Sequence, residues 1–181
     1  NINGNSRTID KVIRRELSFS EGDAYNKFSI NYSKDKIRSL NFFESVELNE
    51  ERTSDPDKLN LNIAVIEKNT GSATIGAGYG DQNGTTLTAG ISESNFLGKG
   101  QKVKFSTSFS STQNLYDVSI TEPYFYNKDL SVRGDLYSKF SDPESVNYET
   151  ETVGVGFSLA FPLSASNRIT TKYSLLTSKT I

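Results

Sequence analysis

Hydrophobic and polar residues alternate with a period of two from residue 72 to the end of the chain. In the first such segment, residues 72–80, the apolar positions are Ala73, Ile75, Ala77 and Tyr79. Alternation is typical of β-strands, because successive side chains point to opposite faces of a sheet. Six further segments repeat it, with apolar positions Leu87, Ala89 and Ile91; Val103, Phe105 and Phe109; Tyr116, Val118 and Ile120; Val132, Leu136 and Phe140; Val153, Val155, Phe157, Leu159 and Phe161; and Ile169, Tyr173 and Leu175. The pattern therefore predicts seven antiparallel strands, each with one apolar face.

Two folds have strands of this kind, the transmembrane β-barrel and the soluble β-sandwich. Segments of roughly ten residues that are separated by turn residues are typical of the barrel. The charge on the polar face also favours a barrel, because a water-filled lumen tolerates more charge than a solvated sandwich face needs. The charged residues of this face are Lys102, Lys104, Asp117, Arg133, Asp135, Lys139 and Lys172.

Aromatic residues and turn lengths point the same way. Aromatic clusters lie at strand ends, at residues 123–126 and 161–162, where a membrane interface would place them. The connections 96–100, 126–129 and 164–167 are compact, whereas residues 141–148 form a long polar connection. Short turns on one side and longer loops on the other fit a barrel. A soluble β-sandwich remains the alternative.

The first 68 residues follow a different pattern. Apolar positions 9, 12, 13 and 17 share one face of a short predicted helix, for which Thr8 is the expected N-cap. A second helix is expected from about Asn26 to Leu40, with Phe28 and Tyr32 one turn apart. Two alternating segments follow, with apolar positions Phe42, Val46 and Leu48 in the first and Leu59, Leu61, Ile63 and Val65 in the second. These elements predict a helix pair that covers a small antiparallel sheet.

Composition removes several classes of function. The chain has 181 residues, of which 34 % are hydrophobic, and no stretch approaches the ~20 apolar residues of a membrane-spanning helix. A net charge of −2 gives no reason to expect nucleic-acid binding. Because the chain has neither His nor Cys, the commonest general base and the usual transition-metal ligands are missing. We therefore assign no catalytic residue, cofactor, metal site or small-molecule substrate.

Several short motifs carry a resemblance to a known family. Residues 4–5, 14–16, 21–22, 42–46 and Glu67 resemble a polypeptide-transport-associated (POTRA) domain, and residues 69–71, 78–80, 95–100 and 122–125 resemble the opening barrel strands of the outer-membrane insertases that assemble β-barrels. The resemblance implies an α+β POTRA domain over residues 1–68, with its first strand clipped. Residues 69–181 would then be an incomplete transmembrane β-barrel of about seven strands. The chain begins at Asn1 without a signal peptide, so we expect an internal piece of a longer, exported precursor.

The resemblance also implies a function and partners. It implies a non-enzymatic subunit that folds and inserts β-barrel proteins into the bacterial outer membrane, with residues 1–68 in the periplasm. The implied partners are outer-membrane lipid, accessory lipoproteins of the assembly complex and unfolded β-barrel clients. Arg14 and Glu21 match positions at which such a POTRA domain meets a lipoprotein. The residues alone favour a solvated helix face for Arg14.

The first predicted barrel strand is the candidate for a lateral gate. An unpaired strand edge presents backbone N–H and C=O groups on which a client strand can pair by β-augmentation. Because the residues of this strand are small, side-chain packing would hold it only weakly against the last strand of a closed barrel. The candidate residues are Ser72, Ala73, Thr74, Ile75, Gly76, Ala77, Gly78, Tyr79 and Gly80. The alternatives are a polypeptide-secretion transporter of the same superfamily and a soluble β-sandwich binding module.

Overall fold

The computed structural model describes residues 1–55, 58–81, 83–142, 148–164 and 167–181. The chain divides into two compact units. The first comprises Asn1–Thr70 with Leu97–Gly100, and the second comprises Gly71–Phe96 with Gln101–Ile181. The connections expected at 141–148 and 164–167 fall partly on residues 143–147 and 165–166, which lie outside the described residues.

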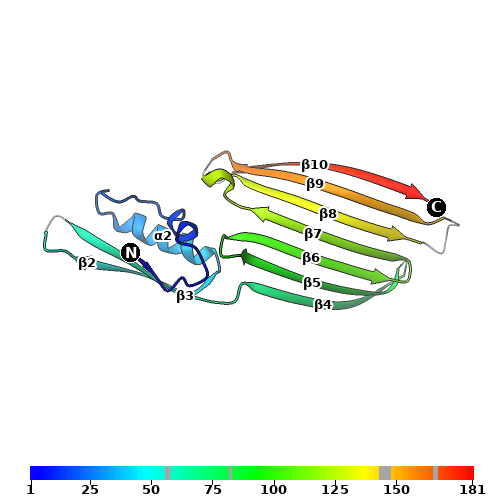
Figure 1. Cartoon of the computed structure of the whole chain (residues 1–181), viewed down its shortest axis with the longest axis horizontal. Coiled ribbons are helices and arrows are strands. Elements are labelled where there is room, and N and C mark those ends of the chain that lie inside the picture. The colour runs from blue at the N-terminus through cyan, green and yellow to red at the C-terminus, as the bar shows by residue number, and fades with distance from the viewer. Residues whose placement is uncertain (56–57, 82, 143–147, 165–166) are drawn as a thin grey trace. The chain divides into compact units, whose positions relative to one another are not determined.

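The first unit contains a three-stranded sheet and two helices (Figure 1). Strands β2 (Phe43–Arg52) and β3 (Leu59–Glu67) pair antiparallel, as their alternation predicts. Strand β1 (Ile2–Asn3) pairs parallel to β3, so the sheet has the order β1-β3-β2. The predicted antiparallel pair is confirmed, and the short N-terminal strand adds a parallel edge to it.

Helix α2 (Lys27–Ser39) lies where its periodicity predicts it. Asn26 caps it, because its side-chain oxygen accepts hydrogen bonds from the backbone N–H groups of Phe28 (2.9 Å) and Ser29 (3.3 Å). The Phe28 and Tyr32 rings stack on its outer face with centroids 6.3 Å apart. No helix in the described part of the chain is long and apolar enough to cross a membrane.

Helix α1 (Asp10–Arg14) begins differently from the sequence prediction. Ile9 occupies the N-cap position, and no side chain caps the helix. The prediction of Thr8 as N-cap was wrong, because Thr8 is buried and its backbone N–H donates to the carboxylate of Glu67. A residue distant in the sequence thus determines how this helix begins.

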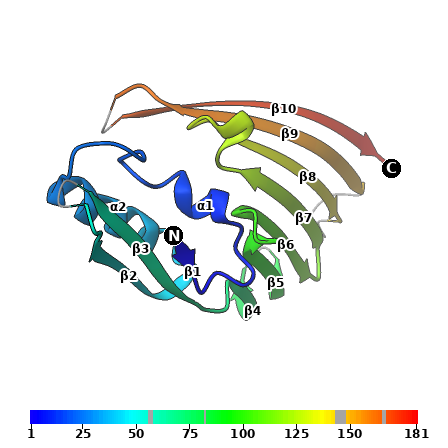
Figure 2. The ribbon, with the colours of Figure 1, turned by 60° about the vertical axis from the view of Figure 1, so that its left-hand side comes forward.

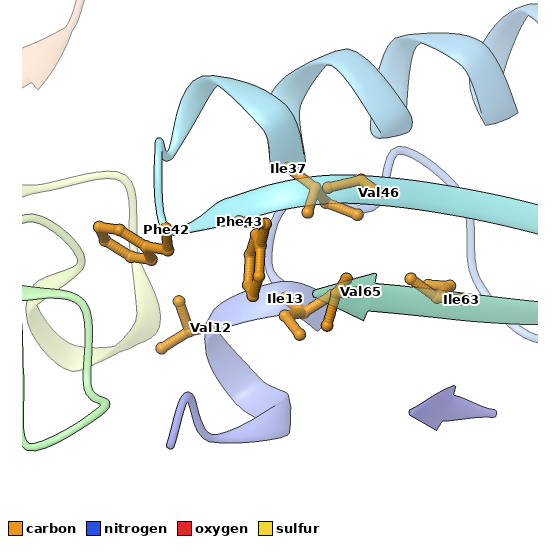
Figure 3. Close-up of a cluster of buried hydrophobic side chains, with 8 residues drawn as sticks. All are labelled: Val12, Ile13, Ile37, Phe42, Phe43, Val46, Ile63 and Val65. Carbon is orange, nitrogen blue, oxygen red and sulfur yellow. The ribbon is translucent and has the colours of Figure 1, made fainter. Parts of the chain in front are cut away.

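The core of the first unit lies between the helices and the sheet (Figure 3). It takes residues from α1, α2, β2, β3 and the position just before β2: Val12, Ile13, Ile37, Phe42, Phe43, Val46, Ile63 and Val65. Phe42 and Phe43 are both buried although they are adjacent in the sequence. Phe42 lies before the first residue of β2 and is therefore outside its alternation. The register shift between Phe43 and Ser45 brings Phe43 and Val46, three residues apart, into the same core, because a bulge interrupts the alternation of β2.

The second unit is one seven-stranded antiparallel sheet with strands in chain order (Figures 1 and 2). Its strands are β4 (Gly71–Gly80), β5 (Gly84–Phe96), β6 (Gln101–Ser110), β7 (Gln113–Glu122), β8 (Ser131–Ser141), β9 (Thr150–Pro162) and β10 (Arg168–Thr180), and a 3₁₀ turn, η1 (Phe125–Asn127), follows β7. Figure 2 shows these strands as one curved layer. The seven predicted strands are confirmed. The sheet is open, with β4 and β10 at its edges.

The register keeps the apolar positions of neighbouring strands on one face. Ile91 lies opposite Phe105, and Phe105 lies opposite Val118. This apolar face is exposed, most strongly at Ile75 (89 %) and Tyr79 (80 %). A β-sandwich would cover such a face with a second sheet. The described residues of the second unit form no second sheet.

Candidate functional site

Strand β4, the candidate gate, has one strand neighbour among the described residues. It pairs with β5 along its whole length, from Gly71 opposite Glu93 to Gly80 opposite Gly84. In an antiparallel ladder the N–H and C=O groups of successive residues point alternately to the two sides of the strand. Alternate residues of β4 therefore direct their backbone groups to β5, and the others direct theirs to the edge of the sheet.

Side chains add little to the pairing of β4. The hydroxyls of Ser72 and Ser92 are 2.9 Å apart, and the Thr88 hydroxyl donates to the Gly76 carbonyl at 3.4 Å. A Cβ atom at Gly78 would meet no atom within 4 Å. Backbone hydrogen bonds therefore hold β4 to β5. The structure brings residues 72–80 together in one strand, as the sequence predicts.

Arg14 and Glu21 lie in the first unit and face one another. The Arg14 Nη1 and Glu21 Oε1 atoms are 3.4 Å apart, and the two side chains are 51 % and 95 % exposed. An ion pair with this exposure contributes little to stability, because water and salt screen it. Both charged groups are accessible to a partner. A charged group of that partner would compete with Arg14 for Glu21, or with Glu21 for Arg14.

Glu67 ends β3 and organises the loop before α1, a role that its position in the sequence does not reveal. Its carboxylate accepts hydrogen bonds from the Ser6 hydroxyl (2.9 Å), the Arg7 N–H (2.9 Å) and the Thr8 N–H (2.7 Å). The Arg7 guanidinium also lies 3.7 Å from it. Since the Glu67 side chain is only 7 % exposed, water competes weakly for these bonds.

The hydrogen bonds to Glu67 change its acidity. Burial alone would raise the pKa of this carboxyl, but the hydrogen bonds from the Thr8 side chain and from the Thr8, Arg7 and Ser6 groups outweigh burial. Together they lower the pKa from its ordinary value of 4.5 to about 2. Glu67 is therefore a structural anion rather than a proton donor at neutral pH.

The turn Leu97–Gly100 belongs to the first unit although it joins β5 to β6. The Gly98 carbonyl accepts a hydrogen bond from the Ile9 N–H at 3.0 Å. Gly98 has a φ of 70°, and a Cβ atom there would lie 1.9 Å from the Arg7 carbonyl oxygen. Only glycine fits this position without a backbone shift. The prediction of a compact connection over residues 96–100 is thus confirmed, and the close contact with Arg7 explains why residue 98 is a glycine.

Groups for catalysis or metal binding are scarce. Within the described residues, no group of three or more acidic, His or Cys side chains is placed to hold a metal ion. The two candidate sites lie in different units, the Arg14–Glu21 pair in the first and β4 in the second.

Comparison with known families divides the chain into two parts. Residues 1–68 match the POTRA family, described as the surface antigen variable number repeat. Residues 95–180 match the Omp85 superfamily domain.

The chain is also similar to individual proteins. The outer membrane protein assembly factor BamA of Neisseria meningitidis is 32 % identical over 174 residues, which are 93 % of this chain and 22 % of the relative. BamA of Buchnera aphidicola is 29 % identical over 171 residues, 92 % of this chain and 28 % of the relative. The chain therefore spans less than a third of the length of these relatives.

Solved structures share the fold. The crystal structure of BamA from Haemophilus ducreyi lacking POTRA domains 1–3 matches with a TM-score of 0.88 and 28 % identity, over 99 % of this chain and 35 % of that chain. CdiB from Acinetobacter baumannii matches with a TM-score of 0.61 and 15 % identity, over 97 % of this chain and 36 % of that chain. The second likeness concerns the fold alone.

The Glu67 carboxylate predicts a pH-dependent stability. Because the pKa of Glu67 is lowered by folding, its stabilisation should be complete above about pH 4.5 and should be lost as the pH falls towards 2. Glu67→Gln should lower the unfolding free energy of the first unit by about 1–3 kcal/mol at pH 7. The variant and the wild type should converge at low pH, as measured by chemical denaturation of residues 1–70. A constant difference at every pH would contradict this role.

Proposed function

Because the chain belongs to the Omp85 superfamily, we propose that it is the part of an outer-membrane assembly factor in which a POTRA domain meets the first strands of the barrel. Residues 1–68 are the POTRA domain in the periplasm, and residues 69–181 contribute strands to a β-barrel in the bacterial outer membrane. Its work is to fold and insert other β-barrel proteins. It catalyses no covalent reaction.

The exposed apolar face of the seven-stranded sheet supports a membrane location. Large apolar side chains point outward along every strand, including Leu87, Phe105, Leu136 and Tyr173. Such a continuous apolar face is stable in hydrocarbon and prone to aggregation in water. The opposite face carries most of the charged side chains of the strands, as a lumen does. Outer-membrane lipid is therefore a partner of this sheet.

The edge of β4 is the observation on which the proposed mechanism rests. In hydrocarbon an unsatisfied backbone N–H or C=O group costs several kcal/mol, so an edge exposed by opening binds another strand strongly. The weak side-chain packing of residues 72–80 makes this pairing independent of the client sequence. We propose that β4 is one side of a lateral gate and the template for the first client strand.

The Arg14–Glu21 pair is the proposed contact for an accessory lipoprotein. Glu21 is almost fully exposed, and its carboxylate can exchange Arg14 for a basic group of the partner. Charge complementarity of this kind mainly sets the specificity and the rate of association.

A polypeptide-secretion transporter of the same superfamily is the second candidate. The likeness to CdiB, at 15 % identity, concerns the fold alone and does not separate the two candidates. A transporter would move its substrate along the polar face instead of pairing it with β4. The position at which a stalled substrate is captured therefore separates the two candidates.

Glu21→Lys tests the lipoprotein contact. The substitution puts a positive charge at residue 21, close to Arg14 and to the proposed basic group of the partner. Repulsion should weaken binding about fivefold or more while the fold is retained. Binding of the full-length protein to its lipoprotein is measured by surface plasmon resonance, with circular dichroism as the control for folding. A reciprocal acidic substitution on the partner should restore affinity. Unchanged binding of Glu21→Lys would exclude this contact.

Proline substitutions test the template strand. Thr74→Pro and Gly76→Pro remove a backbone donor, so each should slow client insertion about tenfold or more. Thr74→Ser and Gly76→Ser keep the donor and are the matched controls. Insertion is measured with the full-length protein in liposomes, as the rate at which a client becomes heat-stable. Equal effects of proline and serine would contradict the template mechanism.

A further inference from the structure

The polar face of the seven-stranded sheet has a positive excess, although the whole chain has a net charge of −2. In the described strands, this face carries six cations against two carboxylates, a net charge of +4. The cations are Lys102, Lys104, Arg133, Lys139, Arg168 and Lys172, and the carboxylates are Asp117 and Asp135. Arg168 forms an ion pair with Asp129, which precedes β8. The sheet thus concentrates positive charge on one surface of an acidic chain.

The register places three of these cations in one transverse row. The row runs across five strands and alternates cations with hydroxyls, in the order Lys102, Thr121, Arg133, Ser158 and Lys172. Neighbouring strands are about 4.8 Å apart, so the cations are about 10 Å apart along this basic row. Lys104 lies in the next row, opposite Ser92 of β5. The basic row lies at the end of the sheet where the chain enters β4.

Arg133 is held in place within the basic row. Its Nε and Nη2 atoms donate to Asp135 Oδ1 at 2.6 and 2.5 Å. Asp135 is buried against Gly156, where a Cβ atom would come within 3.3 Å of its carboxylate. The guanidinium is therefore oriented before any ligand arrives, with three of its five N–H donors outside this pair.

A hollow of about 430 Å³ lies on the same part of the polar face. Four members of the basic row line it, together with Asp135 and the residues at the next positions of β8, β9 and β10. The lining is Thr121, Ser131, Arg133, Asp135, Ser158, Ala160, Thr170 and Lys172. Cations and hydroxyls together are the groups that bind carboxylates and phosphates.

We propose that the basic row binds acidic side chains of an unfolded polypeptide that lies along the polar face. This inference rests on the proposed function, since the polypeptide would be a client. A phospholipid would place its acyl chains on apolar surface, and that surface is on the other face of the sheet. An extended polypeptide needs only the polar face, and carboxylates along it meet cations spaced about 10 Å apart.

The basic row acts by attraction over a distance rather than by tight binding. Exposed ion pairs are individually weak, so each contact forms and breaks rapidly. Several cations on one surface still raise the local concentration of an acidic segment. This combination retains a client on the polar face without trapping it.

Charge removal from the basic row is the test. The full-length protein in neutral detergent micelles is titrated with a fluorescent Glu-Ser repeat peptide and with a Gln-Ser peptide of equal length. Lys102→Gln combined with Lys172→Gln should weaken binding of the Glu-Ser peptide about two- to thirtyfold at low salt. High salt should abolish the difference. Arg133 stays in place, because its loss would leave Asp135 without its partner.

The control also removes two positive charges, one on β8 and one on β10, both outside the basic row. Lys139→Gln is combined with Lys179→Gln. Lys139 lies on the polar face and pairs with Leu115 and Thr152, whereas Lys179 pairs with Glu151 on the opposite face. This control should bind the Glu-Ser peptide as the wild type does. Equal losses in the two double variants, or no preference of the wild type for the Glu-Ser peptide, would overturn the inference. Binding of glycerol 3-phosphate without binding of the peptide would also overturn it, in favour of a headgroup site.

A separate assay distinguishes failure of this inference from failure of the proposed function. Client insertion is measured with the wild-type protein in liposomes. Insertion without any preference for the Glu-Ser peptide would overturn the basic row and leave the insertase function intact. Peptide binding to the basic row without insertion would overturn the insertase function.

Discussion

The antiparallel backbone ladder is the constraint on which the second unit depends. Each strand must pair in one register, because a shift by one residue would exchange its apolar and polar faces. The observed register keeps Ile91, Phe105 and Val118 on the same face across three strands. The same register builds the basic row on the opposite face. The apolar face and the polar face are therefore two consequences of one hydrogen-bonding pattern.

The ladder also explains why β4 differs from the other strands of the sheet. Pairing with β5 satisfies one side of β4, and its small side chains add little to this seam. Backbone hydrogen bonds are common to all polypeptides, so a seam held in this way can exchange one strand for another. A strand held by large interlocking side chains would be specific for one neighbour. The weak packing of β4 is thus the physical basis of its proposed role.

Periodicity predicted the elements, and long-range contacts determined what periodicity could not predict. The seven strands and α2 follow from local patterns, and so do the residues of the candidate gate. The start of α1 does not, because the Thr8 N–H bonds to Glu67, which is 59 residues away. The parallel pairing of β1 and the requirement for glycine at Gly98 likewise depend on distant backbone. The ion pair between Arg14 and Glu21 forms across the end of a helix, where spacing gives no guide.

Cysteine cross-linking of a stalled client tests the central claim most directly. Single cysteines are placed along residues 72–80 of β4 and, for comparison, at Ser106 and Ser158 on the polar face. The client carries a cysteine in its final strand. The account predicts disulfide capture along β4, at positions that shift in step with the client cysteine as paired strands require. Capture at Ser106 and Ser158 with none along β4 would contradict the account and favour transport along the polar face.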